Sequence, residues 1–228
     1  NTGDNEGSSY FQVNQRRGLR VSAATAFLKP VLKRPNLNLQ TGVTVDRVLI
    51  EGGRAVGVVY RQHGRTVTAR ARGEVVLAAG AIGSPAILQR SGICDPALLK
   101  AAGIEVTHAA PGVGANLQDH LQIRPVYKVS GVRTLNTDYA NLIRRAMMGI
   151  DYALFRRGPL TMAPSQVGLF AKSHDRYATP NLQFHFQPLS LDKWGDGMHP
   201  FGAGTASVCN LRPTSRGEVQ VTSPDPDA

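Results

Sequence analysis

Alternation of apolar and polar side chains runs through two parts of the chain and predicts antiparallel strands in both. In the first part, residues 43–50, 55–60 and 66–71 alternate, and glycine-containing turns separate them. Short alternating segments bounded by such turns are typical of a β-meander. Further strands are predicted at residues 10–13, 104–106, 121–129, 167–171, 182–186, 205–211 and 218–221.

Apolar residues at helical spacing predict three helices outside these strands. Residues 22–32 form the first, although Pro30 removes a backbone hydrogen bond and should bend or end it. A short helix is predicted at residues 97–102, after an Asp-Pro pair that suits a helix start. The longest helix is predicted at residues 138–157, where apolar residues recur along one side until a Gly-Pro pair stops it.

Residues 74–92 carry a pattern of strand, tight turn and helix. The apolar run at residues 75–79 predicts a strand buried on both faces. Small residues follow at 80–83, and a helix opens at Ser84 and ends at Gly92. Small residues at such a turn let a cofactor approach the backbone, and a helix N-terminus favours anionic groups. An ordinary strand-to-helix turn of any α/β protein has the same pattern.

Residues 80–93 read GAIGSPAILQRSGI and resemble the second signature of the GMC (glucose–methanol–choline) flavin oxidoreductases. Other segments that resemble this family are residues 17–58, PGVGANLQDH at 111–120, TPNLQFHFQP at 179–188 and RPTSRGEVQV at 212–221. The resemblance covers nearly the whole chain. The combination of PGVGANLQDH with the signature segment makes it specific.

The resemblance implies an α+β fold with parts of two domains. Residues 36–119 would form part of an FAD-binding α/β domain. Residues 120–228 would form an antiparallel-sheet substrate-binding domain covered by helices, to which residues 1–35 would add an N-terminal part. The family's GxGxxG loop and its HPxGT-like segment with the catalytic histidine have no match in the chain. We therefore expect a central fragment with no catalytic residue, and FAD bound by the full-length parent but absent from this chain.

The resemblance assigns cofactor contacts to five positions. Val45 lies where the family uses a backbone group near the adenine of FAD. Ala79, Gly80 and Ala81 lie where the family's chain passes the flavin, and Asn116 belongs to a segment near the border of the two domains. A plain strand valine and a tight turn would explain the same residues without a cofactor.

The polar residues of the predicted strand at 182–186 make its polar face a candidate substrate site. Gln183, His185 and Gln187 alternate with apolar residues, so they share one face. That face would meet either solvent or a polar cavity. The resemblance to the family's substrate sheet favours a cavity beneath the flavin, which makes His185 a candidate substrate-binding residue.

Gln166 is the second candidate substrate-binding residue. Residues 163–170 resemble the segment where choline-oxidising members of the family place a glutamate. Glutamine keeps the shape of glutamate but not its charge, so it favours a neutral alcohol over the choline cation. Asp192 and Asp196, near Trp194, could replace the missing carboxylate, and Gln166 could instead face solvent.

Composition excludes several other classes of protein. The 228 residues carry a net charge of +10, but no basic run interleaves with aromatic residues, which argues against nucleic-acid binding. Cys94 and Cys209 lie far apart without zinc-type spacing, so we expect two free, buried thiols and no metal site. No run of about 18 apolar residues occurs, so no transmembrane helix is expected. We expect a cytoplasmic protein that could associate with a membrane.

The resemblance implies that the parent oxidises a primary alcohol to an aldehyde by hydride transfer to FAD. The substrate would be a small-molecule alcohol, and oxygen, a quinone or another compound could accept the electrons. The alternatives are a choline dehydrogenase proper and a non-catalytic small-ligand-binding domain.

Overall fold

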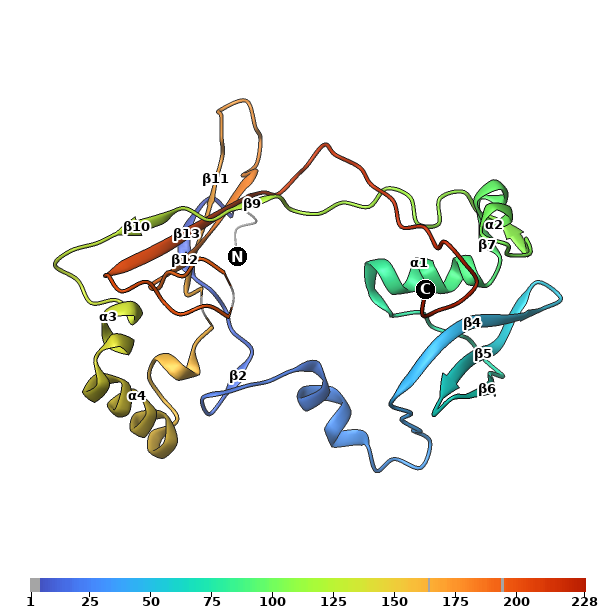
Figure 1. The fold of residues 1–228 in the computed structure, drawn as a ribbon, viewed down its shortest axis with the longest axis horizontal. Coiled ribbons are helices and arrows are strands. Elements are labelled where there is room, and N and C mark those ends of the chain that lie inside the picture. Colours follow the sequence, from blue (N-terminus) through green and yellow to red (C-terminus); the bar gives the residue numbers. More distant parts are fainter. Residues whose placement is uncertain (1–4, 164, 194) are drawn as a thin grey trace. The chain divides into compact units, whose positions relative to one another are not determined.

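The computed structural model describes residues 5–163, 165–193 and 195–228, and the chain divides into two compact units. Unit 1 comprises Asn1–Leu37 and His120–Pro213, and unit 2 comprises Asn38–Asp119 and Thr214–Ala228. Each unit has its own sheet and helices (Figure 1). Residues 214–228 cluster with unit 2, whereas the sequence analysis grouped them with the part that begins at residue 120. The binding of FAD by one part and substrate by the other stays a prediction.

Unit 1 is built on a six-stranded antiparallel sheet in the order β1-β11-β12-β13-β10, with β9 also paired to β13. The strands are β1 (Gly7–Tyr10), β9 (Gln122–Ile123), β10 (Val126–Lys128), β11 (Val167–Ala171), β12 (Leu182–Gln187) and β13 (Ala203–Asn210). Five of the eight residues of β13 are buried, so this strand forms the centre of the unit. The first strand ends at Tyr10, whereas the sequence predicted a strand over residues 10–13.

The long helix predicted at residues 138–157 is two helices, α3 (Leu135–Ala140) and α4 (Leu142–Phe155). Asn141 between them has an extended backbone, and its side chain accepts a hydrogen bond from the Arg144 amide at 3.1 Å. A capping asparagine therefore starts a new helix inside the predicted one. Thr134 caps α3 through a capping box with Thr137, which explains the earlier start.

Short helical turns and a small hairpin complete unit 1. They are a hairpin of β2 (Gln15–Arg16) and β3 (Leu19–Arg20), a π-helical turn η1 (Ala24–Leu28), and 3-10 turns η2 (Lys29–Val31) and η3 (Pro159–Thr161). The helix predicted at residues 22–32 is thus irregular. It ends in the 3-10 turn that contains Pro30, as the missing backbone donor predicts.

Unit 2 contains the predicted antiparallel meander and two helices. Its elements are β4 (Val43–Glu51), β5 (Arg54–Gln62), β6 (Arg65–Arg70), α1 (Gly80–Arg90), α2 (Pro96–Ala101) and a short parallel pair, β7 (Ile93–Cys94) with β8 (His108–Ala109). Cys94, Leu99 and Ile104 form its buried core. Ile104 was expected in a strand, but the residues that pair with β7 lie four positions later.

The predicted buried strand at residues 75–79 is wrong. These residues have no regular secondary structure, and the Val76 side chain is 80% exposed. A strand needs a neighbour for its backbone hydrogen bonds, and none of the strands in the described residues pairs with this run. Residues 218–221 also form no strand.

The mixture of helices and antiparallel sheets confirms the predicted α+β fold class. The two cysteines are both free and buried, as the sequence predicted.

Candidate functional site

One face of the unit 1 sheet gathers the polar residues of three neighbouring strands. His185 in β12 pairs with Gly168 in β11 and with Ser207 in β13, and residues that pair across antiparallel strands lie on the same face. Continuing this register places Gln187 beside Thr205 on the same side. We call this set the polar sheet face: Gly168, Gln183, His185, Gln187, Thr205, Ser207 and Cys209. The same register also places Phe170 on this face, opposite Gln183.

The polar sheet face is shielded from solvent at several positions. Ser207 is 1% exposed and Gln187 is 8% exposed, whereas Phe186, on the opposite face of β12, is 41% exposed. The polar side of this strand is therefore at least as well covered as the apolar side. This arrangement is the reverse of a strand whose polar residues meet bulk water.

Two buried polar atoms of this face lack a hydrogen-bond partner among the described residues. They are Oε1 of Gln187 and Oγ of Ser207. The amide nitrogen of Gln187 is satisfied, because it donates to Ser165 Oγ at 3.0 Å. Since buried polar atoms are normally paired, these two oxygens are available to a water molecule or to a ligand hydroxyl.

His185 is half-buried in the middle of the face and is covered by an aromatic ring. The Phe11 and His185 ring centroids are 5.0 Å apart, with an angle of 38° between the ring planes. Burial lowers the pKa of His185 below its usual value, so the imidazole is neutral at pH 7. A neutral imidazole can donate one hydrogen bond and accept another. A side chain at Gly168 would collide with the Phe11 ring, at 2.6 Å from an added Cβ.

Gln166 directly precedes strand β11. Its amide donates to the Phe186 carbonyl at 3.0 Å, and its carbonyl accepts from the Phe11 amide at 2.9 Å. The second bond continues the pairing of β1 with β11, but the first does not continue the pairing of β11 with β12, because Phe186 is already the partner of Val167. Two residues of one strand that oppose a single residue of the next form a bulge, where the alternation of faces is interrupted. The approach of Gln166 to His185 therefore stays a prediction.

The sequence reasoning missed Thr205 and Ser207. Both alternate with the apolar residues Ala206 and Val208, which is the same signal that identified His185. Thr205 Oγ1 donates to the Leu189 carbonyl at 2.8 Å, and so holds the loop that follows β12 against the sheet.

The loop after β12 is fixed by a buried asparagine in α3. Nδ2 of Asn136 donates to the Ser190 and His199 carbonyls at 3.1 and 3.0 Å, and its Oδ1 accepts from the Ser190 amide at 2.9 Å. Asp192 contacts His199 Nε2 at 3.2 Å and is otherwise solvent-exposed, as is Asp196. Trp194, whose orientation was open, lies outside the described residues.

In unit 2, the small residues proposed to contact the flavin lie at the N-terminus of α1. Ala79, Gly80 and Ala81 are exposed, and the N-cap residue Ala79 has no side chain that accepts the first helix amides; Ser84 Oγ accepts only from the Ala79 amide, at 2.9 Å. Gly80 has a φ of 84°, and an added Cβ would meet no atom within 4 Å. An uncapped helix start with open space around it fits an anionic cofactor group.

The other two proposed cofactor residues use their backbone differently. The Val45 carbonyl accepts a hydrogen bond from Arg90 Nη2 at 3.2 Å, so that carbonyl already has a partner within unit 2. Asn116 is exposed and has a φ of 63°, and its carbonyl accepts from Gln118 at 3.4 Å. The Asn116 side chain has no hydrogen bond among those described that would prevent it from meeting a ligand.

The C-terminal end of α1 is tied to several segments of unit 2. Gln89 donates to the Val219 carbonyl at 2.7 Å and accepts from the Val221 amide at 2.8 Å. Ser91 Oγ accepts from the Val48 amide at 2.8 Å. Residues 218–221 form no strand, and their backbone bonds instead to the Gln89 side chain and, through the Val219 amide, to the Gly114 carbonyl at 2.8 Å.

A sequence model described as GMC oxidoreductase matches residues 1–122 of the chain. The chain belongs to this family. Its signature segment is therefore α1 together with the turn that follows, and the LQRSG part of that segment is the tightly bonded end of the helix.

Among curated relatives, the chain is 38% identical to "Oxygen-dependent choline dehydrogenase 1" of Chromohalobacter salexigens, over 92% of this chain and 38% of that protein. It is also 38% identical to "Alcohol dehydrogenase [acceptor]" of Pseudomonas putida, over 97% of this chain and 40% of that protein. The chain thus spans about 40% of the length of these relatives.

Solved structures support the same fold. Pyridoxine 4-oxidase from Mesorbium loti aligns with 99% of this chain and 40% of that chain, at a TM-score of 0.77 and 27% sequence identity. No helix in the part of the chain that the structure describes has the length and hydropathy to span a bilayer. The described ranges also contain no cluster of three or more metal-ligating side chains.

Proposed function

We propose that the chain is part of an FAD-dependent oxidoreductase that acts on CH–OH donors and oxidises a primary alcohol to an aldehyde. The observation that carries this proposal is the match to the GMC family over residues 1–122. Relatives named as choline and alcohol dehydrogenases support an alcohol as the substrate class.

FAD would be held by residues of unit 2. Ala79, Gly80 and Ala81 would meet it at the uncapped start of α1, where backbone amides can donate to the cofactor. Val45 and Asn116 would add a backbone and a side-chain contact. When bound, FAD supplies the acceptor for the hydride that leaves the alcohol carbon.

The substrate would lie on the polar sheet face of unit 1, which would bind it by hydrogen bonds and not by charge. Neutral His185 can accept or donate a hydrogen bond at an alcohol oxygen, and Gln166 would contribute a neutral amide. Among the residues that define this face, none is a carboxylate. A quaternary ammonium group would therefore be desolvated there without a compensating negative charge, which disfavours choline.

Flavin chemistry in the full-length protein tests the reaction class. The purified protein should show flavin absorbance, and addition of a neutral primary alcohol without oxygen should bleach it as the flavin is reduced. A full-length protein that carries no flavin would contradict the proposal. The 228-residue chain alone should leave FAD fluorescence unchanged on titration. Stoichiometric binding of FAD by this chain would contradict the expectation that it does not hold the cofactor by itself.

The choice between a neutral alcohol and choline can be tested separately with Gln166→Glu. We expect the wild-type full-length protein to prefer the neutral alcohol. The substitution should shift the kcat/KM ratio toward choline by about tenfold, which corresponds to about 1.4 kcal/mol. A wild type that prefers choline, or a ratio that does not move, would show that Gln166 does not set the charge preference.

A further inference from the structure

Helix α4 of unit 1 carries a stripe of large apolar side chains that nothing in the described residues covers. Ile143, Met147, Ile150 and Leu154 are spaced by four, three and four residues, and their exposed fractions range from 56% to 73%. This spacing puts all four on one side of the helix. It is also the spacing of the a and d positions in a pair of packed helices. We call these four residues the α4 stripe.

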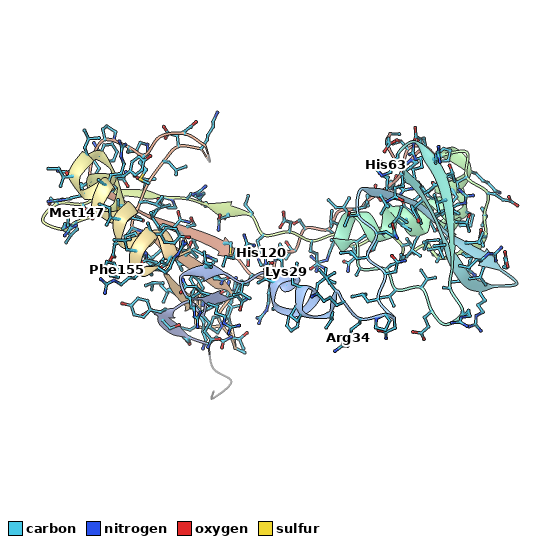
Figure 2. The ribbon with its side chains drawn as sticks, turned by 90° about the horizontal axis from the view of Figure 1, so that it is seen from below. Lys29, Arg34, His63, His120, Met147 and Phe155 are labelled. Carbon is cyan, nitrogen blue, oxygen red and sulfur yellow. The ribbon has the colours of Figure 1, made fainter. Side chains whose placement is uncertain are left out.

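The side of α4 opposite the stripe packs within its own unit. Tyr152 lies nearly half a turn around the helix from the stripe, and it lines a pocket with the β2–β3 hairpin and η3. The stripe itself borders a groove of about 520 Å³, which Met147 and Ile150 line together with Arg133, Asp138 and Pro159 of the same unit. Figure 2 shows Met147 and Phe155 at separate turns of α4. An apolar surface of this extent on a soluble unit usually marks a binding surface.

The residues that flank the stripe are self-complementary under a two-fold axis. With Met147 and Leu154 at a positions, Arg144 and Asp151 occupy e positions on one flank. Ala146 and Ala153 occupy g positions on the other flank. In an antiparallel pair related by a two-fold axis, each e position faces the e position of the other helix. Arg144 of each copy then faces Asp151 of the other copy, so the two-fold axis generates two equivalent ion pairs. On the opposite flank, the small alanines allow the two helices to approach closely.

We propose that α4 pairs with α4 of a second copy of this chain in an antiparallel arrangement. Ile143 packs near Leu154 of the second copy, and Met147 packs near Ile150. The new ion pairs between the two helices form without breaking the ion pairs that already exist within each chain. Arg144 bonds to Asp138 at 3.1 Å and Asp151 bonds to Arg157 at 3.0 Å, so the new contacts continue an alternation of charge.

The charges beside the stripe are mixed, since Arg133, Asp138, Arg144 and Asp151 all line the groove there. A mixture of both signs suits a second copy of the same surface, whereas an anionic lipid surface selects clusters of about four to eight basic residues. Two of the nearby arginines are turned elsewhere, since Arg145 lies over the Tyr139 ring and Arg156 over the Tyr152 ring. A helix of 14 residues is only about 21 Å long, so the pair alone would be a small interface with a dissociation constant of about micromolar.

Sedimentation equilibrium of the 228-residue chain tests the pairing, over about 1 to 200 µM to span a micromolar dissociation constant. Wild type should pass from monomer to dimer in this range. Arg144→Asp and Asp151→Arg each oppose like charges across the axis and should weaken the dimer at least about tenfold. An equimolar mixture of the two variants should form a heterodimer, and the double variant should regain the homodimer. Only antiparallel pairing of these two positions gives this pattern.

Two matched controls distinguish effects at the α4–α4 interface from general effects of substitution. Arg145→Asp makes the same charge change on the far side of the helix and should dimerise as wild type does. Ile150→Asp should abolish the dimer, whereas Phe27→Asp, at a side chain that is 76% exposed on η1, should not. Far-UV circular dichroism confirms that each variant is folded, and Arg144→Gln replaces Arg144→Asp if the latter is not.

Several results would overturn the proposal. One is a wild type that stays monomeric up to the highest concentration, and another is a pair of single variants that do not associate when mixed. A third is a monomer that binds vesicles of phosphatidylcholine with phosphatidylglycerol and loses that binding in Ile150→Asp, which would assign the stripe to a lipid surface.

Discussion

The two ends of helix α1 carry similar residue types but differ in what surrounds them. Each end has a serine whose hydroxyl accepts a backbone amide, and each has a glycine with positive φ, Gly80 at 84° and Gly92 at 78°. The C-terminal end is buried and bonds to β4 and to residues 219–221. The N-terminal end is exposed and follows the unpaired run at residues 75–79. The C-terminal end of α1 is therefore held by hydrogen bonds within unit 2, whereas the N-terminal end exposes its backbone amides.

The difference shows which parts of the family signature act within unit 2. Gln89 and Ser91 stabilise unit 2 by satisfying backbone groups far away in the sequence. Glycine at position 80 is required by its own positive φ of 84°, but no described residue crowds it, since an added Cβ meets no atom within 4 Å. The open space beside Gly80 is explained if a cofactor lies there, as proposed. Matched substitutions at the two ends can therefore separate stability from cofactor binding.

The largest effect is expected at Gly92. Alanine there would adopt a strained positive φ and would place Cβ 2.4 Å from the Glu105 carbonyl oxygen and 2.5 Å from the Thr107 hydroxyl. We expect Gly92→Ala to lower the free energy of unfolding by about 3 kcal/mol or more. Gly80→Ala has the same backbone strain without a collision and should cost only about 1 kcal/mol. Urea denaturation of both variants measures the difference, and equal losses would show that packing at Gly92 does not matter.

The next largest effect is expected at Gln89. Its side chain is 2% exposed and holds Val219 and Val221, so Gln89→Leu removes both bonds without opening a cavity of note. We expect a loss of about 2 to 3 kcal/mol, because two backbone groups lose their partners. Hydrogen exchange at the Val221 amide should accelerate with it. Gln118→Leu, at an exposed glutamine, is the control and should change neither quantity; a Val221 amide that stays protected would contradict the role of Gln89.

These long-range bonds mark the limit of what the sequence could predict. Local patterns correctly gave the meander of unit 2, because alternation and glycine turns act between neighbours in sequence. They also gave Gly92 as the helix end. They could not reveal that Gln89 replaces a strand for residues 219–221, which lie 130 positions away.

The prediction of a strand at residues 75–79 failed because it assumed a pairing partner for this run. An apolar run identifies a strand only if a neighbouring strand is present to pair with it, and composition cannot supply that neighbour. At the polar sheet face, alternation correctly grouped Gln183 and His185. The position of Gln166 could not be predicted in the same way, because its amide bonds to the Phe186 carbonyl out of register with the pairing of β11 and β12.

The two serines of α1 offer a smaller, matched test. Ser91 Oγ accepts from the Val48 amide at 2.8 Å and donates to the Ile87 carbonyl at 2.6 Å in a buried position. Ser91→Ala leaves a buried amide without an acceptor and should cost about 1 to 2 kcal/mol. Ser84 Oγ accepts from the Ala79 amide at 2.9 Å at the exposed end, where water can replace it. Ser84→Ala should therefore cost less than about 0.5 kcal/mol by the same denaturation measurement. A larger loss at Ser84 would reverse the comparison.

The smallest change in the free energy of unfolding of this chain is expected for Val76→Ser. Its side chain is 80% exposed, so Val76→Ser removes almost no buried apolar surface and should change the free energy of unfolding by less than about 0.5 kcal/mol. In the full-length protein the outcome should differ. If residues 75–79 form a strand there, buried between neighbours that this chain lacks, the same substitution places a hydroxyl in an apolar layer and should lower the melting temperature by several degrees. Val132→Ser, at a valine of unit 1 that is 62% exposed, is the control and should be neutral in both proteins. If Val76→Ser is neutral in the full-length protein as well, the exposed end of α1 is not completed by packing around this run, and its small residues need another explanation.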